Sequence, residues 1–123
     1  LDAFRLPKST PEEQAARKEA VQAATRRAIE VPALTMELAY AALDLLEAMV
    51  REGNPNSVSD AGVGALCVRA AVHGAWLNVQ TNTGGLKDAE FVRQVSERGQ
   101  VLAHRTEERV AELVRLVEDK IRG

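Results

Sequence analysis

The chain has 123 residues, the length of one domain, with 46% hydrophobic, 28% charged and only 3% aromatic residues. The formal net charge is −2, so the chain lacks the excess of basic residues that is typical of nucleic-acid-binding proteins. A single cysteine, Cys67, excludes an internal disulfide and a cysteine-only metal site. We therefore expect one domain with an aliphatic core over residues 1–123, no nucleic-acid partner, and a cytoplasmic setting that keeps the thiol reduced.

Helical patterns begin near residue 11. Thr10 is an N-cap candidate, Pro11 suits the first helical position, and Glu13 completes a capping box, which together predict a helix over residues 11–30. Pro32 removes a backbone donor and disfavours helix at the residue before it. A second, separate helix is therefore predicted over residues 33–51, with Gly53 as its stop.

The predicted second helix carries apolar side chains on two faces. One face holds Leu34, Leu38, Leu45 and Met49, and the other holds Leu43, Leu46 and Val50. A helix that is apolar on most sides is buried on most sides. The run over residues 31–50 is nearly long enough to span a membrane, but three acidic residues interrupt it, so we expect a core helix and no membrane partner.

Two further helices are predicted over residues 60–80 and 89–122, the last one capped by Asp88. No useful length of strand alternation is present. The predicted fold is thus all-α, a bundle of about four helices (11–30, 33–51, 60–80 and 89–122), with one apolar seam left over that favours dimerisation.

Polar residues collect between the second and third predicted helices, in the segment GNPNSVSDAGVGA of residues 53–65. A turn followed by a cap at Ser57 or Ser59 explains part of this composition. A ligand site uses the same geometry, because free N–H groups and a partial positive charge at a helix N-terminus favour a carboxylate such as Asp60. Gly64 and Cys67 leave space above that carboxylate. The residues alone predict a pocket and no reaction.

This segment resembles the cyclodeaminase domain of formiminotransferase-cyclodeaminases, a family that also contains methenyltetrahydrofolate cyclohydrolases. The segments AFRLPK (3–8), AAVHGAWLNVQTN (70–82) and GLKD (85–88) share the resemblance, which spans essentially the whole chain. It implies an all-helical, dimer-forming domain that converts 5-formimidoyltetrahydrofolate to 5,10-methenyltetrahydrofolate and releases ammonia. Tetrahydrofolate is then the substrate, with no separate cofactor. Cyclohydrolase activity is the alternative.

The resemblance also implies roles for individual residues. Asp60 would stabilise the positively charged folate carbon and shuttle a proton to the leaving amine, while Asn54 and Asn56 would orient the substrate. Arg5 and Lys8 would meet the glutamate tail of folate. Three weaker folate-binding candidates are Ser59, Asn78 and Asn82. The two histidines have no metal-ligand spacing, so no metal site is expected.

One feature of the family is absent from the sequence. Family members begin with further helices, including a glycine- and serine-rich segment that borders the active site, and we expect this chain to be part of a longer protein. The absence also keeps open a non-catalytic alternative, in which the chain is a helical dimerisation module with the family's fold.

Overall fold

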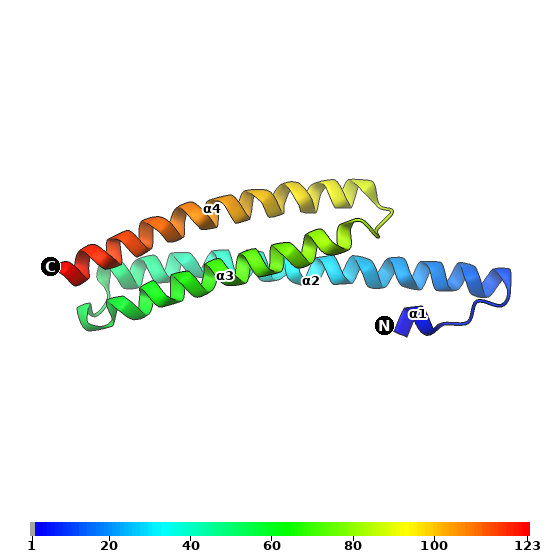
Figure 1. Cartoon of the computed structure of the whole chain (residues 1–123), viewed down its shortest axis with the longest axis horizontal. Helices are drawn as coiled ribbons and strands as arrows, with labels where there is room; N and C mark the ends of the chain where they lie inside the picture. Colours follow the sequence, from blue (N-terminus) through cyan, green and yellow to red (C-terminus); the bar gives the residue numbers. More distant parts are fainter. Residues whose placement is uncertain (1) are drawn as a thin grey trace.

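The computed structural model describes residues 2–123, and within that range it is helical with no strand (Figure 1). No helix in this range is long and apolar enough to cross a membrane. In Figure 1, α3 and α4 run along one part of the long helix α2, and α1 lies beside the other part. The elements are α1 (Asp2–Arg5), α2 (Pro11–Glu52), the 3₁₀ turn η1 (Pro55–Ser57), α3 (Val58–Thr83) and α4 (Ala89–Arg122).

The predicted helix break at Pro32 is wrong, because α2 continues through it for 42 residues, or about 63 Å. A proline inside a helix costs about 3 kcal/mol. On either side of it, Ile29 and Met36 are 0% and 1% exposed and pack against α3 and α4. Burial of each such side chain contributes about 1.5–3 kcal/mol, so the two together offset the proline. The capping box at Thr10 is present as predicted.

The core of the bundle follows a seven-residue spacing on α2, at Ile29, Met36, Leu43 and Val50. These side chains meet buried residues of α3 and α4, among them Val72, Val79, Leu102 and Val110. Leu43 and Val50 are thus buried as predicted. The contacts of this buried stripe set how the three long helices α2, α3 and α4 are aligned along one another.

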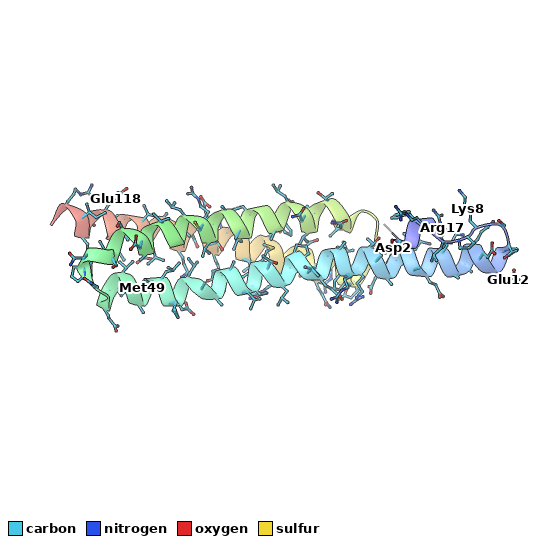
Figure 2. The ribbon with its side chains drawn as sticks, turned by 90° about the horizontal axis from the view of Figure 1, so that it is seen from below. Asp2, Lys8, Glu12, Arg17, Met49 and Glu118 are labelled. Carbon is cyan, nitrogen blue, oxygen red and sulfur yellow. The ribbon has the colours of Figure 1, made fainter. Side chains whose placement is uncertain are left out.

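The other predicted apolar face of α2 is not buried. Leu34, Leu38 and Leu45 are 58%, 64% and 67% exposed. At 100° per residue, Leu38 lies directly opposite Ile29 on the helix, so its face points away from the core. Figure 2 shows α2 and α3 side by side in front of α4, which leaves this side of the bundle uncovered.

The indole ring of Trp76 on α3 packs over Gly99 of α4. A Cβ atom at residue 99 would lie 2.1 Å from Cζ3 of Trp76. We expect Gly99→Ala to lower the free energy of unfolding by about 1–3 kcal/mol, even though alanine is the better helix former by about 1 kcal/mol. Urea denaturation measures the change.

Gly74→Ala is the matched control for this prediction. A Cβ at residue 74 meets no atom within 4 Å, so only the gain in helix propensity remains. We expect this variant to be neutral or about 0.5–1 kcal/mol more stable. Equal effects of the two substitutions would contradict the contact between Trp76 and Gly99.

Arg98 of α4 and Glu37 of α2 form a two-bond ion pair, with Nε–Oε1 and Nη2–Oε2 distances of 2.6 and 2.8 Å. The hydrogen bonds from Arg98 lower the pKa of Glu37, against a smaller opposing effect of burial. A lowered folded-state pKa adds stability above the unfolded-state pKa, and this stability is lost as the pH falls through the folded-state value. The side chains are 52% and 40% exposed, so the pair contributes at most about 1 kcal/mol.

Glu37→Gln should therefore lower the free energy of unfolding by up to about 1 kcal/mol at neutral pH. The difference from the wild type should shrink as the pH falls below about 4, where the carboxyl of the unfolded chain is protonated. Urea denaturation across this pH range measures it. Glu112→Gln removes an exposed glutamate from the interior of α4, without an ion pair in residues 2–123, and should change nothing. A difference for Glu37→Gln that is constant with pH would contradict the pair.

Candidate functional site

The turn between α2 and α3 holds the predicted catalytic residues at one end of the bundle. The N–H of Gly53 donates to the carbonyl of Met49 at 3.0 Å and ends α2. Oδ1 of Asn54 accepts a hydrogen bond from the N–H of Asn56 at 3.0 Å, and the carbonyl of Asn54 accepts one from the N–H of Ser57 at 2.9 Å. The side chain of Asn54 therefore builds the turn itself, as its residue type predicts.

Asp60 lies in the first turn of α3 and is exposed. Ser57 occupies the N-cap position, but its side chain makes no capping hydrogen bond. Within residues 2–123, the Asp60 carboxylate has no hydrogen bond or ion pair, and Asn56 and Ser59 are also exposed. This end of α3 thus presents a carboxylate and an amide, at a helix N-terminus that the Ser57 side chain does not cap, to whatever binds there.

The space expected above Asp60 is filled, so that part of the prediction is wrong. Leu46 of α2 lies against Gly64, where a Cβ atom would be 2.8 Å from its Cδ2. Cys67, one turn further on, is exposed. The glycine therefore serves the close packing of α2 on α3, and Asp60 lies on the surface of a single copy of the chain.

Asn78 and Asn82 line a groove between α2 and α3 of about 670 Å³. The two asparagines are joined to each other by a hydrogen bond from Nδ2 of Asn82 to the carbonyl of Asn78 at 2.8 Å. The volume lies within the range of small-molecule pockets. The sequence analysis did not predict that α2 lines this groove, because it placed a helix break at Pro32. Of the remaining lining residues, Arg27 and Thr35 are polar and the others are small or apolar, among them Val31, Ala70, Ala71 and Gly74.

The predicted site residues do not meet in one place. Asp60 and Asn78 lie on the same face of α3, because 18 residues make five whole turns, but they are about 27 Å apart along the axis. Arg5 belongs to α1, and Lys8 is held by a hydrogen bond from Gln14 to its carbonyl. Figure 2 shows Lys8 near one end of the molecule and Met49 near the other. The structure brings together Asn54, Asn56, Ser59 and Asp60, pairs Asn78 with Asn82, and sets Arg5 and Lys8 far from both groups.

The histidines have structural partners. Nε2 of His73 lies 2.9 Å from an oxygen of Glu107, which Arg69 approaches at 3.6 Å, so this cluster ties α3 to α4. His104 lies 3.4 Å from Glu108 on the exposed side of α4. Among residues 2–123, no three His, Cys, Asp or Glu side chains are placed to hold a metal ion.

Comparison with known proteins identifies the family of this fold. Residues 1–100 match the family formiminotransferase-cyclodeaminase. The chain is 39% identical to the methenyltetrahydrofolate cyclohydrolase of Methylorubrum extorquens over 94 residues. This aligned stretch covers 76% of this chain and 45% of that protein. It is 36% identical over 97 residues to the formimidoyltransferase-cyclodeaminase of Gallus gallus, covering 79% and 18%, and 34% identical over 98 residues to that of Mus musculus, covering 80% and 18%. The chain spans less than half the length of each of these relatives. The resemblance predicted from the turn at Asn54 and its companion segments is confirmed, and the chain belongs to the formiminotransferase-cyclodeaminase family.

Proposed function

We propose that this chain acts in tetrahydrofolate one-carbon metabolism and closes 5-formimidoyltetrahydrofolate to 5,10-methenyltetrahydrofolate, with release of ammonia. The observation that carries the proposal is the family match over residues 1–100, which contain all eight predicted site residues. The structure adds support, because Asp60 and Asn56 present unpaired polar groups at the uncapped N-terminus of α3.

The proposed role of Asp60 follows from the charges of the reaction. N10 of the folate attacks the formimidoyl carbon, the new C–N10 bond forms, and the bond to the imino nitrogen breaks. The substrate reacts in its protonated, amidinium-like form, whose imino nitrogen carries two hydrogens; the proton lost from N10 moves to that nitrogen as the third, so that it leaves as ammonia and the positive charge stays on the methenyl product. A carboxylate beside the carbon can carry this proton and stabilise the cationic product. Asn56 would orient the substrate through its amide. No cofactor besides the folate substrate is needed.

A second copy of the chain is proposed to cover the exposed face of α2 and α3. The exposed apolar side chains on this face form a larger patch than single surface residues do. Between Val31 and Met49 the stripe is about 27 Å long and two helix diameters, or about 20 Å, wide. A second copy would bury an area of the order that stable dimers need. The members of the patch include Val31 (52% exposed), Leu38 (64%), Leu45 (67%), Val63 (60%) and Leu77 (65%).

This pairing would also complete the site. Asp60 and the groove at Asn78 lie on one face of α3 about 27 Å apart. A two-fold pairing of antiparallel copies across this face brings the turn at Asp60 of one copy toward the groove of the other. We therefore propose a homodimer or larger homo-oligomer in which each folate site takes residues from two copies.

Leu38→Glu tests the pairing. A buried unpaired carboxylate is costly, so the variant should sediment as a monomer and lose most of its activity. Val101→Glu is the matched control, since Val101 is 40% exposed on α4, which lies behind α2 and α3 in Figure 2. Sedimentation velocity measures the assembly. Wild-type protein that is monomeric at all concentrations would contradict the pairing.

A cyclohydrolase is the second candidate function. It is favoured by the 39% identity to a methenyltetrahydrofolate cyclohydrolase over nearly half of that protein. The same carboxylate would then activate a water molecule for attack on the methenyl carbon. A non-catalytic dimerisation module is a third candidate, favoured by the packing of Leu46 into the space beside Gly64. The exposed thiol of Cys67 suits a reducing cytoplasm for all three.

Two assays run side by side, both with a metal chelator present, separate these candidates. Purified protein is mixed with 5-formimidoyltetrahydrofolate, and methenyl absorbance and ammonia are followed together. In parallel, the loss of absorbance of 5,10-methenyltetrahydrofolate reports hydrolysis. One ammonia for each methenyl group formed supports cyclodeamination, and hydrolysis without ammonia release supports the cyclohydrolase. Absence of both reactions in a protein that is folded and dimeric supports the module and contradicts the catalytic proposal.

A further inference from the structure

A small pocket lies where α1 folds back on α2, separate from the groove between α2 and α3. Three of its six lining residues are cations and none is acidic. Its volume is about 160 Å³, and it is lined by Phe4, Arg17, Lys18, Val21, Gln22 and Lys87. We propose that this pocket binds an oxyanion, namely a carboxylate or phosphate group at the end of a ligand.

Arg17 supplies a donor without a partner. Its Nη2 donates to the carbonyl of Phe4 at 3.1 Å, and its guanidinium carbon lies 5.9 Å from the centre of the Phe4 ring. The Nε atom is buried and has no hydrogen-bond partner among residues 2–123. A buried donor left unpaired costs about 1–3 kcal/mol, and more on a charged group. An oxyanion that accepts this hydrogen bond removes that cost and gains a charge-assisted contact.

The two lysines add positive charge that no ion pair within residues 2–123 offsets. Neither Lys18 nor Lys87 takes part in an ion pair within residues 2–123. The acid next to Lys87 in sequence, Asp88, is directed elsewhere: one oxygen lies 3.0 Å from Arg26, and the other accepts a hydrogen bond from the N–H of Phe91. The pocket therefore concentrates unpaired positive charge in a protein whose net charge is −2.

The pocket is already formed without a ligand. Nε2 of Gln22 donates to the carbonyl of Gly85 at 2.9 Å, and the N–H of Lys87 donates to Oε1 of Gln22 at 2.8 Å. These two hydrogen bonds attach the turn before α4 to α2 and hold Lys87 beside Arg17 and Lys18. Preorganised donors lower the entropic cost of binding.

The volume limits what enters. At about 30 Å³ per water molecule, the pocket holds roughly five waters, whereas pockets for whole small-molecule ligands have volumes of about 300–1,000 Å³. It therefore suits a terminal charged group, with the rest of the ligand outside. Phe4, 61% exposed, offers apolar surface at the rim. Arg17 and Glu52 are about 52 Å apart along α2, so the pocket does not depend on the proposed chemistry at Asp60.

Isothermal titration calorimetry with sodium phosphate and with glutarate, at about 20 mM NaCl to limit screening, tests the proposal. We expect saturable binding of at least one anion. Lys87→Gln and Arg17→Gln should each weaken binding about tenfold. Lys87→Gln keeps the hydrogen bond to Gln22, because that bond uses the backbone N–H. Arg105→Gln removes the same charge from an exposed site on α4 outside the pocket and should change binding by less than about twofold.

Comparison of the two anions identifies the kind of ligand that the pocket binds. Tighter binding of phosphate assigns a phosphate ligand, and tighter binding of glutarate assigns a carboxylate ligand. No saturable heat from either anion would overturn the proposal. Equal weakening by Arg105→Gln and Lys87→Gln would also overturn it, because the attraction would then be a property of the net charge and not of the pocket.

Discussion

Asp60→Asn is expected to lower both methenyl formation and ammonia release by about 10²–10⁴-fold. The substitution preserves the shape of the side chain and removes its negative charge and its capacity to carry a proton. Because Asp60 is exposed and has no partner within residues 2–123, the fold should not depend on it. At most about 1 kcal/mol of stability is expected to be lost, from the favourable position of a carboxylate at a helix N-terminus.

Glu97→Gln is the control for this prediction. Glu97 is 63% exposed and pairs with Arg93 near the start of α4, at the other end of the bundle from Asp60 (Figure 1), so its substitution should leave turnover unchanged. Circular dichroism of both variants should match the wild type. A fully active Asp60→Asn variant with wild-type helical content would remove Asp60 from the reaction.

Ile29→Ala is expected to lower the free energy of unfolding by about 2–5 kcal/mol. Ile29 is 0% exposed and packs in the cluster that includes Met36, Val72 and Leu102. Removing three carbons there leaves a cavity between three helices that cannot easily collapse. Small domains are stable by only about 5–15 kcal/mol, so this one change removes a large share.

Ile121→Ala provides the matched comparison, with the same atoms removed from a side chain that is 60% exposed. It should change the free energy of unfolding by about 0.5 kcal/mol or less. Urea denaturation of the two variants at the same protein concentration measures the difference. If Ile29→Ala costs no more than Ile121→Ala, the core face of α2 and its continuation through Pro32 are both wrong.

The sequence predicts the fold well where local signals decide it. The bounds of α4 agree with the predicted 89–122, since Asp88 caps the helix and a single apolar stripe follows. The bounds of α3 extend two to three residues beyond the predicted 60–80. The prediction failed at Pro32. The energetic cost of a proline in a helix can be judged from the local sequence, whereas the burial of Ile29 and Met36 depends on contacts with α3 and α4.

In the candidate site, too, local features could be predicted from the sequence, whereas contacts between distant residues could not. The turn at Asn54 was predictable, because its hydrogen bonds join residues two to three positions apart. The filling of the space beside Gly64 was not, because it depends on the register that brings Leu46 of α2 against α3. The cationic pocket was missed for a similar reason, since Arg17 and Lys87 are far apart in sequence and meet only through the contacts of Gln22.

The most direct measurement is an NMR titration with 5-formyltetrahydrofolate, in which oxygen replaces the imino nitrogen of the proposed substrate. Backbone amide shifts report where the reduced folate binds. We expect saturable changes at Asn54, Asn56, Ser59 and Asp60, which the folded chain gathers at the start of α3. Shift changes confined to other parts of the chain, or none at saturating ligand, would contradict a folate site at this turn.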